Sequence, residues 1–222
     1  MDKNIELRSD LIKKKIEDDL DSIDEEYLEK FFDKFKWDKR TLSFIKYYNK
    51  TVLDEIRIKF STFTYQWALH LTRKFYTYFD ENYDKVINEI KTKKDLINFY
   101  NNFCIDELGI RRGSFCSKLF HTILPSEFPP VDNAIRKHFG LNNEEFIVSV
   151  LIIKKGYEKY IQDNRKKINL IRNILSKNKF SYLRINELSD IRILDMFYWF
   201  KLNRDKAKNQ NYNLKQISKW AR

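Results

Sequence analysis

The sequence predicts an all-α protein, and three observations support this prediction. Apolar residues recur at helical spacing along most of the chain. Strands and helices do not alternate, which argues against an α/β fold. Residues that break helices are rare, with 4 glycines and 3 prolines among 222 residues. Because all the prolines and three of the glycines fall within residues 109–141, we expect an irregular backbone there and nowhere else.

The N-terminal part predicts two helices. Residues 5–20 form a charged pattern, with Leu7, Leu11 and Ile12 as its expected apolar face. Ser22 is expected to begin the second helix, which carries acidic residues in its first turn, where the helix dipole favours them. Its core side is expected to be aromatic and to consist of Tyr27, Phe31, Phe32 and Phe35.

Residues 41–60 and 61–79 give two longer helical patterns. The second is densely aromatic and β-branched, a composition that also suits a strand. Its length and the spacing of Trp67, Leu71 and Phe75 favour a helix. Two short helices are expected at 81–91 and 94–106, separated by a Lys-rich junction.

The segment rich in glycine and proline predicts a hairpin, a helix, an extended turn and a second helix. Gly109 and Gly113 bracket a tight turn with Ile110 as its apolar anchor. Ser114 is the expected N-cap of a helix that runs through Phe115, Lys118, Leu119 and Phe120 and ends at Pro125.

The extended turn is expected at Pro129 and Pro130, because the residue before a proline avoids the α region. Asp132 follows at the start of the next helix, where its side chain can accept hydrogen bonds from free backbone N–H groups.

The C-terminal part predicts further helices. They are expected at 143–162, at 163–176 with one basic side, and from Ser189 through the apolar run that follows it. Residues 180–185 are ambiguous and suit a short extended piece. Residues 203–213 suggest a polar linker before a last short basic helix that ends at Trp220.

The net charge of +11 is unevenly distributed. Residues 1–40 carry a net charge of −3 and residues 163–222 carry +10. A basic excess gathered in one part of a chain suits a polyanion such as nucleic acid. Lysine-rich composition with solvated faces is the alternative explanation.

The sequence lacks the patterns of a membrane protein, of a secreted protein and of a cysteine metal site. There is no apolar run long enough to cross a membrane, and the N-terminus lacks the apolar core of a signal peptide. Cys104 and Cys116 lack the spacing of a metal site, so we expect buried thiols and a cytoplasmic, nucleoid-associated protein.

Residues 109–141 resemble the helix-hairpin-helix DNA glycosylases. Gly109, Ile110 and Gly113 correspond to the hairpin of that superfamily, and residues 128–141 to its Gly/Pro-rich loop and aspartate. The resemblance covers about one seventh of the chain. It departs from the family at the hairpin, where two arginines replace a single residue between the glycines.

The resemblance implies two helical subdomains with a cleft between them. Residues 1–100 would form most of the N-terminal subdomain, with 163–222 as candidates to complete it. Residues 101–162 would carry the helix-hairpin-helix motif and the aspartate segment. The implied partner is double-stranded DNA, which a monomer would bind. No membrane partner is expected.

The resemblance also assigns roles to two side chains. The aspartate after Pro-Val is catalytic in the family, which implies that Asp132 stabilises the oxocarbenium-like sugar and orients the attacking water. The alternative is a plain N-cap, and both roles can hold at once. Bifunctional members use a lysine at the start of the helix after the hairpin. Here Gly113 and Ser114 occupy that place, and Lys118 lies about one turn deeper. Lys118 is therefore either a nucleophile or a solvated lysine, and we expect a monofunctional enzyme.

Backbone N–H groups at the hairpin and helix start are candidates to bind a DNA phosphate. The residues expected in this phosphate site are Gly109, Arg111, Arg112, Gly113 and Ser114. A turn with solvated arginines is the alternative. No metal or organic cofactor is expected, although hairpins of this family bind a monovalent cation.

Other candidates have structural explanations. His121 and His138 are expected to be buried or capping residues. Arg136 can pair with Asp132 or reach a phosphate, and pairing is the expected role. Flipped bases stack on aromatic platforms, but most aromatic residues of this chain must be core. The candidates are Trp37, Trp67, Tyr76, Phe115 and Trp199. Two other functions fit the sequence: a non-catalytic DNA-binding module and a helical protein–protein adaptor.

Overall fold

The computed structural model describes residues 2–33, 46, 49, 81–92, 95–102, 113–177 and 183–209. Across these residues the protein is all-α, as predicted, and contains no strand. The helices are α1 (Asp2–Leu20), α2 (Glu25–Asp33), α6 (Tyr83–Thr92), α7 (Leu96–Phe99), α8 (Gly113–Ile123), α9 (Asn133–His138), α10 (Phe146–Asp163), α11 (Arg165–Ser176), the 3-10 helix η3 (Ile185–Glu187) and α12 (Asp190–Asn209).

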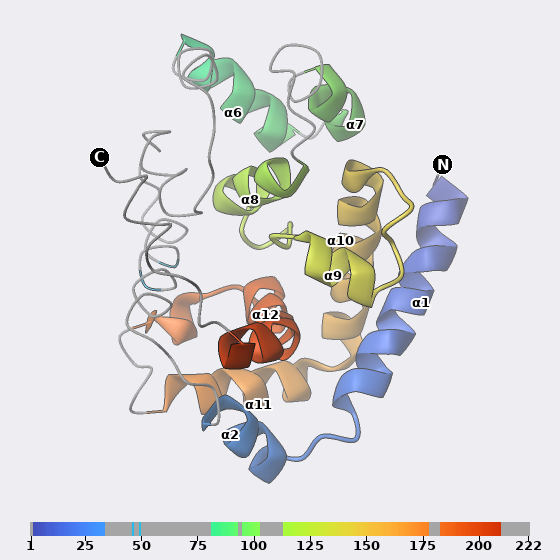
Figure 1. Cartoon of the computed structure of the whole chain (residues 1–222). Coiled ribbons are helices and arrows are strands. Elements are labelled where there is room, and N and C mark those ends of the chain that lie inside the picture. The colour runs from blue at the N-terminus through green and yellow to red at the C-terminus, as the bar shows by residue number, and fades with distance from the viewer. Residues whose placement is uncertain are drawn as a thin grey trace.

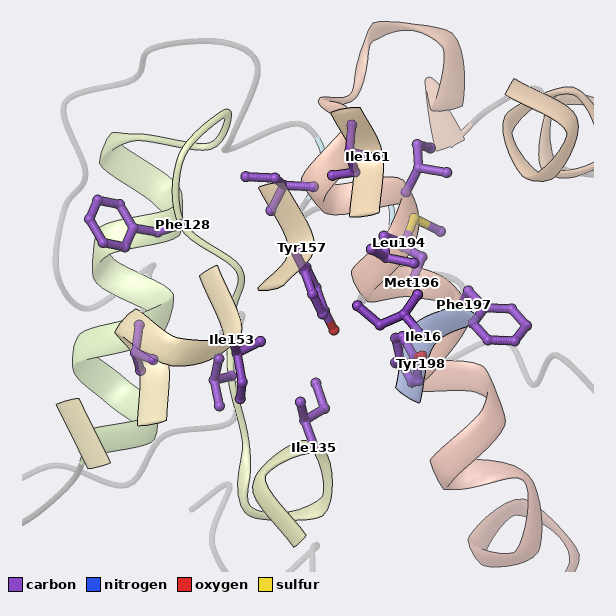
Figure 2. Close-up of a cluster of buried hydrophobic side chains, with 14 of the residues drawn as sticks. Ile16, Phe128, Ile135, Ile153, Tyr157, Ile161, Leu194, Met196, Phe197 and Tyr198 are labelled. Carbon is purple, nitrogen blue, oxygen red and sulfur yellow. The ribbon is translucent and has the colours of Figure 1, made fainter. Parts of the chain in front are cut away.

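The other helices pack around α10 and α12 (Figure 1). α1 lies alongside α10, and α12 contacts α9, α10 and α11. α2 packs on α11 at one end of the molecule, while α6 and α7 lie at the other end, above α8. One buried apolar cluster runs through all of these helices, and Figure 2 shows its part between α10 and α12.

The helix expected at residues 5–20 is present as α1, but its predicted apolar face is only partly right. Leu7 and Leu11 are 66% and 61% exposed. Ile12 is buried as expected, and the buried face continues through Ile16 and Leu20. This face is selected by the close approach of α1 to α10, which the α1 sequence alone does not reveal.

The second helix begins later than predicted, and its core side differs. It starts at Glu25, and Asp24 rather than Ser22 caps it by accepting a hydrogen bond from the backbone N–H of Tyr27 at 2.7 Å. Tyr27 is half exposed and lies over the ring of Phe31. Phe31 and Phe32 are buried as expected, together with Leu28.

The predicted C-terminal helices are present, but their boundaries differ. α10 begins three residues later than the expected 143–162, and α11 begins two residues later than the expected 163–176. Of the ambiguous stretch 180–185 only residues 183–185 are described, and Ile185 begins the 3-10 helix η3. The predicted polar linker is wrong as far as Asn209, because α12 continues to that residue. This part of the sequence contains no glycine or proline, so nothing local stops the helix.

Several expectations fall partly or wholly outside the described residues. Lys46 and Asn49 are helical, but the rest of 41–60 and all of 61–79 lie outside. Cys116 is disulfide-bonded, so the expectation of a free thiol is wrong for this residue. The chain has one other cysteine, Cys104, which lies outside the described residues. Cys116 therefore gives no support for a reducing compartment.

No described helix is both long enough and apolar enough to cross a bilayer.

Candidate active site around Asp132

Asp132 is the N-cap of α9, as predicted. Its backbone is extended, with φ −122° and ψ 177°, and its side chain accepts a hydrogen bond from the backbone N–H of Ile135 at 2.9 Å. The residue is half-buried. The structure thus presents a carboxylate that is fixed in place without being sealed in the interior.

The proline-containing segment before Asp132 is buried and attached to α8. Residues 128–131 are all buried. The hydroxyl of Ser117 donates to the carbonyl oxygen of Val131 at 2.8 Å, and His121 Nδ1 contacts the carbonyl oxygen of Phe128. Since a carbonyl oxygen can only accept, His121 carries a proton on Nδ1. The extended turn is therefore held at two points along one helix.

The other end of α9 is closed by a Schellman motif. Gly140 has a positive φ of 69°, its N–H donates to Lys137 O, and the N–H of Leu141 donates to Arg136 O. The expected pairing of Arg136 with Asp132 is wrong. The Arg136 side chain donates instead to the hydroxyl of Ser149 and to carbonyl oxygens of the α9–α10 loop, and its guanidinium lies over the ring of Phe146.

Lys118 projects from α8 into the neighbourhood of Asp132. Its side chain is half-buried, and its amine donates to the hydroxyl of Ser114 at 2.5 Å. Burial lowers the pKa of the Lys118 amine to about 8, although the charges of Asp132 and Asp195 act in the opposite direction. The alternative prediction, that Lys118 is a solvated lysine, is therefore wrong. An amine with a lowered pKa has a larger neutral, nucleophilic fraction near pH 7.

Asp195 and Arg192 on α12 form a buried ion pair that sequence reasoning missed. Their side chains are 2% and 6% exposed, and Arg192 Nη1 lies 2.5 Å from Asp195 Oδ2. Burial raises the pKa of Asp195 to about 7, with Asp132 adding to the rise and Arg192 and Lys118 opposing it. The signal in the sequence was two charged residues three positions apart inside an otherwise apolar run.

Tyr157 on α10 completes this group of polar side chains. The residue is fully buried, and its hydroxyl has no hydrogen-bond partner among the described residues. Burial raises the pKa of Tyr157, and the charges of Asp195 and Asp132 add to the rise. Figure 2 shows its ring projecting from α10 into the cluster that includes Leu194 and Tyr198.

A second group of polar contacts anchors α9 from its C-terminal side. Asp19 of α1 accepts from His138 Nε2 at 2.7 Å, from Lys201 Nζ at 2.5 Å and from the hydroxyl of Tyr198 at 3.1 Å. Burial acts to raise the pKa of Asp19, but the hydrogen bonds from His138 and Lys201 outweigh it and hold the pKa well below its usual value. His138 is half-buried and pairs with Asp19. The contacts of Asp19 join α1, α9 and α12.

The predicted phosphate site is described only in part. Gly109, Arg111 and Arg112 lie outside the described residues. Gly113 is buried, and a Cβ built on it would lie 2.1 Å from Cγ of Phe146, so tight packing accounts for this glycine. Ser114 is not the N-cap, because α8 already begins at Gly113. Its hydroxyl accepts from Lys118 instead.

Only two of the five aromatic candidates for a base platform lie within the described residues. Trp37, Trp67 and Tyr76 lie outside the described residues. Phe115 is 1% exposed and belongs to the core. Trp199 is half-buried, with its ring edge-on to Phe200. Within the described ranges, no group of three or more metal-binding side chains is arranged to hold an ion.

Comparison with known proteins gives no relative for this chain. No protein-family model matches the sequence, and no curated protein or solved structure matches it significantly.

Proposed function

We propose that the protein is a DNA glycosylase that binds duplex DNA as a monomer through its hairpin. It extrudes a damaged or modified base into a cleft between two helical subdomains and hydrolyses the N-glycosidic bond of that base. The observation that carries the proposal is the placement of Asp132. Its carboxylate is fixed by the Ile135 N–H at 2.9 Å, half-buried, and coupled by charge to the amine of Lys118.

In the proposed reaction, the C1′–N bond breaks and its electrons leave with the base. Positive charge then builds on the sugar, and a nearby carboxylate stabilises it. A water molecule attacks C1′, its oxygen forms the new bond, and Asp132 accepts its proton. The departing base takes up a proton from solvent, and Asp132 releases its proton to solvent, which leaves a free base and an abasic sugar.

Lys118 supports a second branch of the same chemistry. A neutral amine attacks C1′ in place of water and forms a Schiff base with the opened sugar, after which strand cleavage becomes possible. The half-buried position and lowered pKa of Lys118 favour this branch. Against it stands the family pattern, because Lys118 lies one turn beyond the place of the family lysine.

The test is a panel of duplexes that carry oxidised, alkylated, deaminated or hypermodified bases, followed by alkali cleavage. Asp132→Asn is expected to abolish base release and to leave DNA binding intact. Asp95→Asn is the matched control, because Asp95 caps α7 in the same way by accepting from Asn98 N at 3.0 Å. Full activity of Asp132→Asn would show that Asp132 is not the catalytic carboxylate. Borohydride trapping, with Lys118→Arg as control, tests the Schiff base.

One observation favours a non-catalytic DNA-binding module instead. The first turn of α8 carries Ser114 where the bifunctional family members have lysine. Binding that weakens steeply with salt, without an abasic product from any duplex of the panel, would support that alternative.

A further inference from the structure

The proline-containing segment before Asp132 offers few backbone donors to the rest of the protein. Pro129 and Pro130 have no N–H group, and the N–H of Val131 donates within the segment, to Pro129 O at 3.1 Å. Residues 128–131 are buried, and buried carbonyl oxygens need hydrogen-bond donors. The segment therefore depends on its carbonyl groups for polar contacts with the neighbouring helices.

Three side-chain donors hold carbonyl oxygens at three-residue intervals along this segment. The donor and acceptor pairs are Ser189 with Pro125 O at 2.6 Å, His121 with Phe128 O, and Ser117 with Val131 O at 2.8 Å. Two of the donors lie on α8, and the third immediately precedes α12. The contact from Ser117 is the last of the three along the chain and falls directly before Asp132.

The hydroxyl of Ser117 lies between two carbonyl oxygens. A serine within a helix commonly donates to a carbonyl oxygen three or four residues earlier. Thr122 on the same helix does so, to Lys118 O at 2.8 Å. Ser117 has this option at Ser114 O, 3.1 Å away, but Val131 O is nearer at 2.8 Å. Because a hydroxyl has one proton, the nearer oxygen is favoured, and the bond joins α8 to the segment.

The carbonyl group that Ser117 holds belongs to the peptide unit that leads into Asp132. A peptide unit is planar and rigid, so restraining the oxygen of Val131 also restrains the nitrogen and Cα of Asp132. On the other side, the Asp132 carboxylate accepts from the N–H of Ile135 at 2.9 Å. Asp132 is thus held before its backbone by α8 and after it by α9.

We propose that Ser117 is a positioning residue of Asp132, whose hydroxyl orients the peptide unit between Val131 and Asp132 and thereby the carboxylate at the start of α9. Ser117 is fully buried, so it acts through Asp132 rather than on a substrate. Its catalytic meaning rests on the proposed function. Its hold on the carboxylate does not, because this is a property of the folded chain without DNA.

The first test is amide hydrogen exchange of the full-length protein, followed by NMR at Ile135, whose N–H donates to the Asp132 carboxylate. Ser117→Ala removes the hydroxyl and leaves a residue that suits a helix interior, so the variant is expected to fold. It is expected to lower the protection of the Ile135 N–H about fivefold relative to the amides of α11, the effect of one lost hydrogen bond.

Ser149→Ala is the matched control. Ser149 is as completely buried as Ser117, and its hydroxyl lies 3.3 Å from Leu141 O, beyond the opposite end of α9. This variant is expected to leave the relative protection of Ile135 unchanged. If Ser117→Ala lowers that protection no more than Ser149→Ala does, the proposal is overturned.

The second test measures kcat and KM on any duplex from which the wild type releases a base. Ser117→Ala is expected to lower kcat at least about tenfold and to leave KM unchanged, because a displaced carboxylate alters the reacting geometry and not DNA binding. An unchanged kcat would overturn the positioning role in catalysis. If no duplex releases a base, the proposed function fails, whereas the exchange result still decides whether Ser117 holds Asp132.

Discussion

Gly156 of α10 lies directly against Ile12 of α1. A Cβ built on Gly156 would be 2.5 Å from Ile12 Cγ2 and 3.2 Å from the backbone oxygen of Ser9. Ser9 is itself fully buried, so small residues on both helices let the two backbones approach closely. This contact determines which face of α1 is buried.

Gly156→Ala is accordingly expected to destabilise the protein by about 1–3 kcal/mol, the usual cost of inserting a methyl group into a packed core. The measurement is urea unfolding followed by circular dichroism. Gly140→Ala is the comparison, because nothing lies within 4 Å of its Cβ position and any cost comes from its positive φ of 69°. Gly140→Asn should recover part of that cost, whereas no polar substitution should rescue position 156. Wild-type stability in Gly156→Ala would contradict the close contact.

The two roles of Asp132 can be separated by two substitutions. Asparagine caps a helix about as well as aspartate, so Asp132→Asn is expected to keep nearly full stability. Asp132→Ala loses the hydrogen bond to Ile135 N and is expected to cost about 1 kcal/mol. Thermal unfolding of both variants checks this difference. Equal stability of the two variants would mean that the hydrogen bond from Ile135 N to Asp132 contributes nothing to stability.

His121 is expected to make the protein sensitive to mild acid. Burial lowers its pKa from 6.5 to about 3, with Arg192 adding to the effect. The unfolded chain therefore takes up a proton as the pH falls from 6.5 towards 3, and the folded protein does not. The stability present above pH 6.5 should decline over this range by up to about 1.4 kcal/mol per pH unit.

His121→Asn is the variant that tests this slope, since its amide can still donate to the carbonyl oxygen of Phe128. Unfolding free energies measured between pH 4 and 8 should show a flatter profile for the variant. The same slope in variant and wild type would assign the acid sensitivity to other groups.

Asp19 is expected to contribute stability that disappears at lower pH. Its folded pKa is held below the usual value of 3.8 by His138 and Lys201, so its contribution is present above that value and lost as the pH falls through the lower, folded pKa. Asp19→Asn should cost about 2 kcal/mol at pH 7, the scale of hydrogen bonds to a charged group. The difference from wild type should narrow below about pH 4, as seen in urea unfolding at both pH values. A difference that does not change with pH would exclude a charge effect.

Local rules in the sequence predicted the α9 region best. Asp132, Gly140 and the prolines act on the backbone within a few residues, so capping and turn chemistry locate α9 without knowledge of the fold. The same rules failed for Ser114, because α8 begins at Gly113, two residues before the expected first helical residue Phe115.

Features that depend on a partner helix were harder to predict. Leu7 and Leu11 also form a helical stripe, and only the approach of Gly156 shows that Ile12 and Ile16 are the buried side. Asp195 was missed because its helix reads as core, which is correct for its neighbours. Its link to Asp132 and Lys118 exists only once α8, α9 and α12 are brought together.

The two hydrogen bonds from Ser117 and His121 to the proline-containing segment have a further consequence. The helix that carries the Lys118 amine also holds the chain just before Asp132, so the separation of amine and carboxylate is fixed within one short stretch of sequence. Substitutions on the outer surfaces of α1, α2 or α11 can then accumulate without altering this spacing. The spacing of Lys118 and Asp132 therefore does not depend on the identity of residues on those outer surfaces.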